Sequence, residues 1–153
     1  MRRDFDLIRR ILAYMEDQTE MEQFSGGYDE TVKEFEVDVK TLAFHVDLLL
    51  DAKYIDAAVN RARGSCAVVL RRITWGGCEF IEAAKNDGVW SKAKEALKKH
   101  ITSYPLDVLQ RVMNKIILEM VWSGLPDSLP FVGKPHWLSQ RLGKRLVKAL
   151  TGG

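Results

Sequence analysis

The sequence has little of what marks a specialised class of protein. It has only 2 cysteines, Cys66 and Cys78, which form neither a CxxC pair nor a disulfide-dense pattern. With 4 prolines and 46% hydrophobic residues, it lies outside the disordered and collagen-like classes. Its longest apolar runs, such as 66–70, are far shorter than the roughly 20 residues of a membrane span. Because its start shows no signal-peptide pattern either, we expect a folded, cytoplasmic protein with reduced cysteines.

Sequence signatures of catalysis and metal binding are absent as well. The chain contains no phosphate-binding loop, GxSxG, HExxH or dinucleotide fingerprint. The three histidines, His45, His100 and His136, lie in distant segments, and no tetrahedral zinc set can be assembled from them and the cysteines. We therefore expect a protein that is not an enzyme and needs no metal or cofactor.

The formal net charge of +2 conceals an asymmetry along the chain. Residues 16–56 carry 12 acidic and 3 basic side chains, whereas residues 61–153 carry 16 basic and 7 acidic ones. Such a division is a hint of an anionic partner for the basic part. Equally, the two parts can face each other in the fold, and the sequence leaves both interpretations open.

Hydrophobic periodicity predicts most of the elements. Stripes of apolar residues at helical spacing predict helices over 4–15, 39–53, 105–122 and 137–150, the first opened by Asp4 as its N-cap. Residues 17–28 are polar and read as a loop or a frayed helix end, and alternation over 35–39 predicts a short strand. Two β-prone runs, 54–58 and 67–73, flank a basic turn and predict a hairpin. Thr74 then caps a helix whose pattern continues to His100.

Two segments resemble parts of winged-helix domains. Residues 40–55, which contain His45, resemble the recognition helix, and residues 73–81 (I-T-W-G-G-C-E-F-I) look like the segment that follows the wing. Together with residues 1–12 they resemble the domain of unknown function 2513 family, with His45, Trp75 and Gly77 at its characteristic positions. The resemblance covers 1–122, but Lys53 stands where the family usually has glycine. It implies a winged-helix fold and a phage or prophage setting, and no established activity.

Together these observations predict a mainly α protein with a small β-hairpin, an α+β winged helix-turn-helix-like fold. Residues 1–100 are expected to form the winged-helix-like domain and residues 101–123 a packing or dimerisation helix. Residues 124–153 are expected to be a proline-containing linker followed by a basic amphipathic tail helix. Trp75 and Trp90 are expected to pack in the core or at a hinge, and His45 to bond a backbone carbonyl.

The resemblance suggests DNA binding, but the expected recognition helix is poorly suited to it. Lys40, Ala43, Asp47 and Asp51 are expected to face outward, and the two carboxylates would repel a phosphate backbone. Basic side chains of the wing, the second strand and the tail are better candidates for phosphate contacts. The candidate DNA-binding residues are Lys40, Arg61, Arg63, Arg71, Arg72, Arg141, Lys144, Arg145 and Lys148.

The helix predicted over 105–122 has an unusually regular apolar stripe. Such a stripe suits either docking within the chain or a two-fold dimer, and we favour a dimer. Its residues are Leu106, Leu109, Val112, Met113, Ile116, Ile117 and Met120. The basic tail suits a nucleic-acid or membrane surface, a partner protein, or the acidic segment 16–56.

Two functional hypotheses follow from the sequence. The first is a non-enzymatic, phage-associated winged-helix protein that binds DNA, mostly through phosphate contacts, as a regulator or accessory factor. The alternative is a protein-interaction module of the same fold that binds and inhibits or modulates a host or phage protein.

Overall fold

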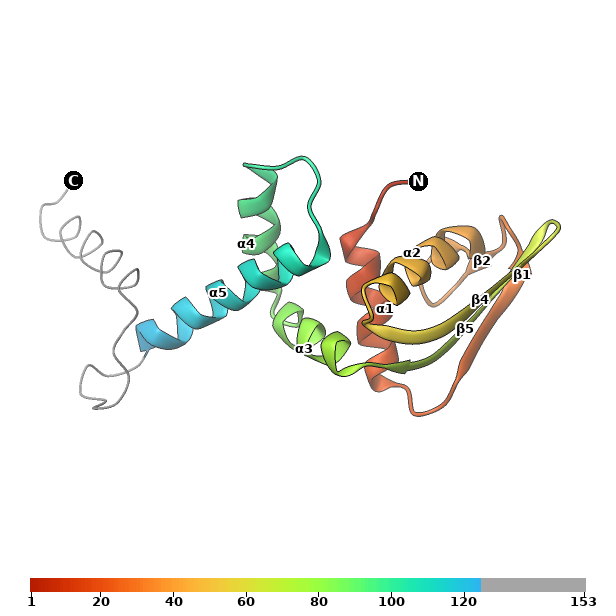
Figure 1. Cartoon of the computed structure of the whole chain (residues 1–153), viewed down its shortest axis with the longest axis horizontal. Helices are drawn as coiled ribbons and strands as arrows, with labels where there is room; N and C mark the ends of the chain where they lie inside the picture. Colours follow the sequence, from red (N-terminus) through yellow and green to blue (C-terminus); the bar gives the residue numbers. More distant parts are fainter. Residues whose placement is uncertain (125–153) are drawn as a thin grey trace, which may run out of the picture.

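The computed structural model describes residues 1–124, which form an α+β fold (Figure 1). Within this part of the chain, five helices accompany a three-stranded antiparallel sheet and a separate two-stranded hairpin. The α+β class predicted from the sequence is therefore confirmed. In chain order the elements are α1 (Phe5–Asp17), β1 (Glu22–Gly27), β2 (Thr31–Val32), β3 (Val37–Asp38), α2 (Val39–Asp51), β4 (Ile55–Ala62), β5 (Ser65–Ile73), α3 (Trp75–Ala84), α4 (Asp87–Lys98) and α5 (Leu106–Gly124).

Side chains cap the first four helices, which fixes where each begins. Asp4 accepts hydrogen bonds from the backbone N–H groups of Asp6 and Leu7, and Thr74 accepts one from Gly77. Both caps were predicted from the sequence and are confirmed. Each cap satisfies a donor that the first helical turn would otherwise leave unpaired. The same role is played by Asp38 for α2 and by Asn86 for α4.

The segment expected to be a loop at 17–28 contains strand β1, so that expectation is wrong. β1 pairs antiparallel with β5, from Glu22 opposite Leu70 to Gly27 opposite Ser65. Periodicity could not reveal it because five of its six residues are polar or glycine, and its only large apolar side chain is Phe24. Pairing with the apolar strand β5 stabilises this segment as a strand, which is a tertiary effect.

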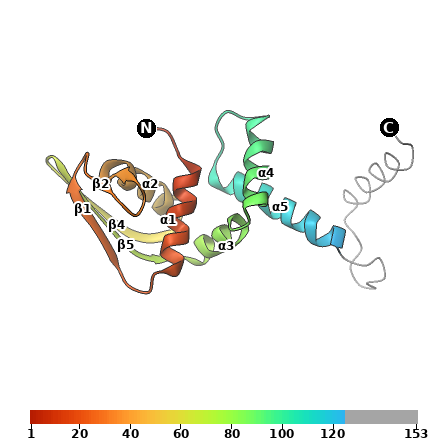
Figure 2. The ribbon, with the colours of Figure 1, turned by 180° about the vertical axis from the view of Figure 1, so that it is seen from behind.

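Strand β5 lies in the middle of the sheet, between β1 and β4. The predicted hairpin is confirmed and is longer than expected, because β4 and β5 pair as far as Ala62 opposite Ser65. Gly64, in the turn between them, has a φ of 81°, a backbone conformation that glycine adopts without steric cost. Along β5, Cys66, Val68 and Leu70 are buried on one face of the sheet. Helices α1 and α2 pack against the sheet (Figures 1 and 2).

The short strand expected over 35–39 is only partly present, as β3. Phe35 lies in the turn between β2 and β3 instead, and it is buried with its ring against Tyr14 and Phe24. The β2–β3 hairpin thereby connects α1 to β1 through a small aromatic cluster. The alternation of apolar and acidic residues over 35–39 therefore arises from one buried turn residue followed by a two-residue strand, not from a longer strand.

The single helix expected from Thr74 to His100 is two helices, α3 and α4. The break falls at Lys85 and Asn86, where Asn86 leaves the helical conformation with a ψ of 112° and caps α4. Helical periodicity continued across the break because both helices bury apolar residues and both pack against α5. The change of direction lets α4 and α5 pack on each other beyond α3 (Figure 1).

Lys53, the residue that departs from the family pattern, has a left-handed backbone. Its φ is 60°, and its N–H donates to the carbonyl of Leu50 just after α2 ends. Glycine is the usual residue for such a helix end because it has no Cβ to clash. Lys53 therefore adopts the backbone conformation that glycine would have at this position, and the helix end is kept.

Candidate functional site

Arg61, in the expected wing, is paired with a carboxylate of α2. Its guanidinium donates a hydrogen bond to Asp47 and forms an ion pair with it. The hydrogen bond that Arg61 donates to Asp47 raises the pKa of Arg61 above its usual value. Because the two charges cancel locally, Arg61 offers a phosphate group less attraction than an unpaired arginine would.

The two arginines of β5 are also beside a carboxylate. Arg71 and Arg72 lie 3.4 and 3.9 Å from the two oxygens of Asp56 on β4. Arg63, at the tip of the hairpin, is exposed and forms no ion pair within residues 1–124. Lys40 is exposed at the start of α2, near Asp38. Hydrogen bonds from Thr41 lower the pKa of Asp38 in spite of its desolvation.

The outward face of α2 is mixed rather than basic. Asp51 is exposed, the Asp47 side chain is 39% exposed, and Phe44 and Leu48 are partly exposed. Ala43 is buried, so the expectation that it faces outward is wrong. This surface combines carboxylates with apolar groups, which is unfavourable for a phosphate backbone. The four basic tail candidates, Arg141, Lys144, Arg145 and Lys148, lie outside the described residues.

His45 is a structural residue, as the sequence predicted. It is 1% exposed, its Nδ1 lies 2.8 Å from the carbonyl oxygen of Thr41, and its Nε2 accepts a hydrogen bond from the N–H of Asp4. These two bonds are satisfied together by a neutral ring protonated on Nδ1. His45 therefore links α2 to the start of α1, and both ring nitrogens are occupied.

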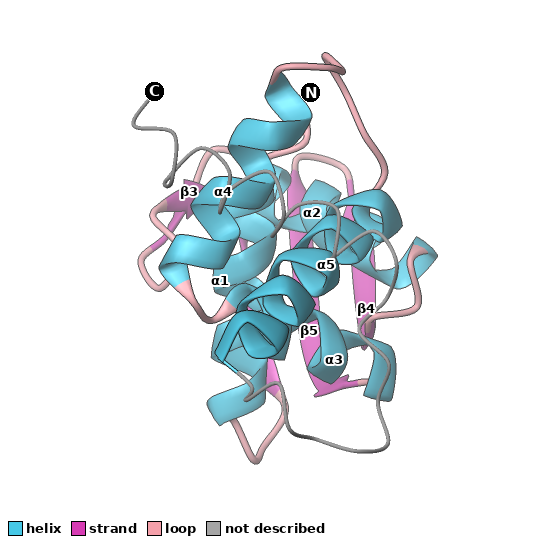
Figure 3. Cartoon of the chain, turned by 90° about the vertical axis from the view of Figure 1, so that its left-hand side faces the viewer, coloured by secondary structure: helices cyan, strands magenta, loops and turns pink. Residues whose placement is uncertain are grey.

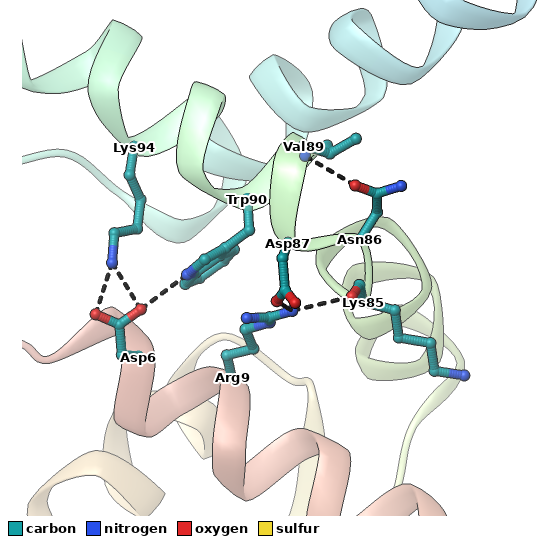
Figure 4. Close-up of polar contacts among 8 residues, drawn as sticks. All are labelled: Asp6, Arg9, Lys85, Asn86, Asp87, Val89, Trp90 and Lys94. Atoms are coloured by element: carbon teal, nitrogen blue, oxygen red, sulfur yellow. Dashed lines mark hydrogen bonds and ion pairs between the residues drawn. The ribbon is translucent and has the colours of Figure 1, made fainter.

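A polar cluster joins α1 to α4 (Figure 4). The carboxylate of Asp6 accepts hydrogen bonds from the indole N–H of Trp90 at 2.8 Å and from Lys94 at 2.6 Å. Desolvation opposes the change, but these bonds lower the pKa of Asp6. Arg9 lies over the Trp90 ring, 5.3 Å from its centre, and pairs with Asp87. Every group in the cluster is engaged within the fold, so the cluster holds the two helices together.

The apolar stripe of α5 divides into a covered and an uncovered part. Leu106, Leu109 and Met113 are at most 9% exposed, so their contacts are with the rest of the chain. These three residues of the expected dimer stripe are thus committed to the protein's own core. Beyond them α5 extends past α3 and α4 (Figures 1 and 2). Val112, Ile116 and Ile117 are partly buried, and Met120 is 48% exposed.

A groove of about 560 Å³ lies between α3 and α5, where the two helices face each other (Figure 3). At its edge stands Trp75, which is 80% exposed. The expectation that Trp75 packs in the core or at a hinge is therefore wrong, whereas the same expectation for Trp90, which is 3% exposed, is confirmed. The groove is lined by Trp75, Cys78, Glu79, Glu82, Ala83, Gln110, Asn114 and Ile117.

Sequence reasoning missed this groove, although it identified Ile117 as a candidate interface residue. Its lining comes from two helices that are 27 residues apart at Ala83 and Gln110, and no single-helix pattern brings them together. The sequence did contain one indication of the groove. Trp75 is followed by two glycines, which have no side chains that could cover its ring. The other cysteine, Cys66, is buried in the sheet.

Neither a metal centre nor a membrane span is found in residues 1–124. No three His, Cys, Asp or Glu side chains in this part of the chain gather closely enough to hold a metal ion. None of the helices described combines the length and the apolar character that crossing a bilayer requires.

Comparison with known proteins places the chain in a family. The model of a family of hypothetical proteins, DUF2513, matches residues 2–103. The chain belongs to the DUF2513 family. An uncharacterized protein from Haemophilus influenzae (strain Rd) is 30% identical over 127 residues, which cover 79% of this chain and 99% of that protein. No solved structure matches the chain. The match confirms the family resemblance seen in the sequence.

Proposed function

We propose that this DUF2513 protein is a non-enzymatic protein-interaction module that binds a partner protein through the α3–α5 groove. The observation that carries the proposal is an apolar stripe that leaves the core partway along α5, next to a Trp75 ring that is 80% exposed. Apolar anchors beside a concave surface are typical of sites where an amphipathic helix docks. The host or phage protein expected from the sequence is the partner we propose.

The scaffold of this module is winged-helix-like. The sheet order β1-β5-β4, with α1 ahead of β1 and α2 directly before the β4–β5 hairpin, supports this interpretation. It differs from a helix-turn-helix in one place, because the β2–β3 hairpin stands between β1 and α2. The hairpin removes the helix that would cross a DNA backbone ahead of a recognition helix.

The charges of the wing favour a protein partner over DNA. Arg61, Arg71 and Arg72 each lie beside a carboxylate within the fold. DNA binding through phosphate contacts needs basic groups whose charge is available to the backbone. Wing-mediated DNA binding remains the second candidate, supported by the exposed Arg63 and Lys40.

Site-specific photocrosslinking tests the groove. We would replace Ile117 with p-benzoylphenylalanine in the full chain, irradiate cells that make the protein, and separate the adducts by mass. A discrete adduct is expected at position 117, reduced by a further Trp75→Ala change. The control places the same photoreactive group at Glu95, which is exposed on α4 and does not line the groove. Equal adducts at both positions, or none at 117, contradict the proposal.

The DNA alternative is tested separately by fluorescence anisotropy with a random-sequence duplex over a salt series. We expect no binding at low salt that depends on the wing. If the protein bound, and the double variant Arg61→Ala/Arg63→Ala reduced the salt slope by roughly 0.9 for each lost phosphate contact, DNA binding would replace the present proposal.

A further inference from the structure

We infer that the α3–α5 groove is covered by the chain's own basic segment, residues 137–150, which a partner protein must displace. The inference rests on the proposed function, since it assigns a first occupant to the same groove. Three features support it: the apolar residues of groove and segment, their charges, and the reach of the chain.

The apolar surfaces of groove and segment match in kind. The groove presents the exposed Trp75 ring and the partly buried Ile117, and the accessible part of α5 continues from it to Val121, 53% exposed. In the sequence, Leu138, Leu142, Leu146 and Leu150 recur every four residues, which predicts one apolar side if the segment is helical. An amphipathic helix in an apolar groove is a recurrent mode of recognition.

Their charges are complementary. The residues lining the groove include two glutamates and no lysine or arginine. Glu82 is paired with Lys85, whereas Glu79 is exposed and makes no ion pair within the described part of the chain. Residues 137–150 contain four basic side chains and no acidic one. Opposite charges around an apolar contact set the orientation of docking and exclude competitors with the wrong sign.

The segment can reach the groove within one chain. Twelve residues, 125–136, separate Gly124 from Trp137, and twelve extended residues span roughly 40 Å. Ile117 lies seven residues before Gly124 on α5, a distance of about 10 Å along the helix axis. A tethered segment also has an effective concentration of about a millimolar, which favours it over a second copy at cellular concentrations.

This arrangement makes the segment a regulator of the groove. A partner would compete with an intramolecular occupant, so its apparent affinity would fall in proportion to the fraction of molecules in which the groove is open. The leucines and basic residues of 137–150 also indicate what the partner resembles, namely a basic amphipathic helix.

A native cysteine reports on the occupant. Cys78 lines the groove and is partly exposed, whereas Cys66 is 3% exposed in the sheet. We would make Leu142→Cys in the full chain, at micromolar concentration, and follow disulfide formation under mild oxidation by non-reducing electrophoresis and peptide mass mapping. The expected product is a monomer with a disulfide between positions 78 and 142, absent when Cys78→Ser is added.

Charge reversal supplies the matched control. Glu79→Lys in the groove should slow the disulfide reaction severalfold, whereas Asp51→Lys, at another exposed carboxylate, on α2, should not change it. The inference is overturned by a disulfide-linked dimer, which would identify a second copy as the occupant. It is also overturned by the absence of the intramolecular product or by equal effects of the two reversals.

The disulfide experiment and the photocrosslinking at position 117 can fail independently of each other. A foreign protein captured at Ile117 without the disulfide from Leu142→Cys would leave the groove a partner site and remove the intramolecular cover. The disulfide without any captured protein would keep the cover and contradict the partner site.

Discussion

Helices α1 and α5 were predicted from the same kind of apolar stripe, but the fold buries the stripe of α1 along its length and that of α5 only in part. In α1 the whole stripe is used, and Leu7, Ile8, Ile11 and Leu12 are all 0% exposed. In α5 the last fully buried residue of the stripe is Met113, whereas Ile116 and Ile117 are partly buried and Met120 is 48% exposed. The two helices differ in what covers them, because α1 lies between the sheet and helices α3 and α4, whereas α5 extends beyond α3 and α4 (Figure 1).

This difference teaches how to separate core from interface. A regular stripe shows that a helix has one apolar side, but the length of chain packed against that side decides what is left exposed. Contiguous apolar side chains that remain exposed on a folded domain usually mark a contact with something else. In this molecule such residues gather at the end of α5 and at Trp75.

The largest expected effect tests the division within α5 itself. Leu109→Ala should lower the free energy of unfolding by about 2–5 kcal/mol, because it leaves a cavity in a core where Leu109 is 0% exposed. Leu118→Ala, the same exchange at a 43% exposed position, should change it by less than about 0.5 kcal/mol. Urea unfolding measures both. Similar losses in the two variants would mean that Leu118 contributes as much to the folded core as Leu109, which contradicts this division of α5.

The second prediction concerns the start of α3, where the sheet region passes into the C-terminal helices. A Cβ on Gly77 would lie 2.1 Å from the backbone oxygen of Tyr54, so Gly77→Ala must displace the backbone. We expect a loss of about 1–3 kcal/mol in the free energy of unfolding. Gly76→Ala is the control, since its Cβ would meet the Tyr54 ring at an ordinary 3.6 Å. If both changes were tolerated, the start of α3 would pack less closely on the backbone of Tyr54 than the structure shows.

Local signals predicted much of this fold. The caps Asp4 and Thr74, the helical stripes over 4–15, 39–53 and 105–122, and the β4–β5 hairpin depend on residues close in sequence, and each was found as expected. Strand β1 was missed because its pairing with β5 lies more than 35 residues away and leaves almost no period-two pattern. The break between α3 and α4 was missed because Asn86 is compatible with both a helix interior and a cap.

The candidate site was less predictable than the fold. The sequence identified the basic residues of the wing, but it could not show that Asp47 and Asp56 lie beside three of them. Those pairs join different elements, and sequence spacing does not specify which carboxylate an arginine meets. The groove depends likewise on how α3 and α5 meet, so only Ile117 among its residues was a candidate in advance.

The third prediction concerns the link between α1 and the C-terminal helices. Asp6→Asn should lower the free energy of unfolding by about 1 kcal/mol at neutral pH, because the charged partner of Lys94 is lost while the exposed carboxylate is partly screened by water. A lower pKa in the folded state means that the ionised form stabilises the fold. This contribution is complete above the ordinary pKa of about 3.9 and disappears as pH falls through the lower folded pKa.

The pH dependence supplies the check on that third prediction. The stability difference between the wild type and Asp6→Asn should shrink as pH decreases from about 5 toward 2, measured by urea unfolding at each pH. Asp87→Asn is a useful comparison, because Asp87 is 88% exposed and its pair with Arg9 should contribute less. A difference that stays constant with pH would show that the carboxylate charge does not hold α4 to α1.

The smallest expected effect comes from replacing lysine by glycine at two positions that differ in backbone conformation, one just after α2 and one inside α4. Lys53→Gly should raise the free energy of unfolding by about 0.5 kcal/mol, because relief of a left-handed backbone with a φ of 60° outweighs the greater freedom of glycine in the unfolded chain. Lys92→Gly, at an exposed position inside α4, should lower it by about 1 kcal/mol. Thermal and urea unfolding of both variants would measure the opposite signs. Destabilisation by Lys53→Gly would show that the lysine side chain contributes more at this helix end than the backbone conformation costs.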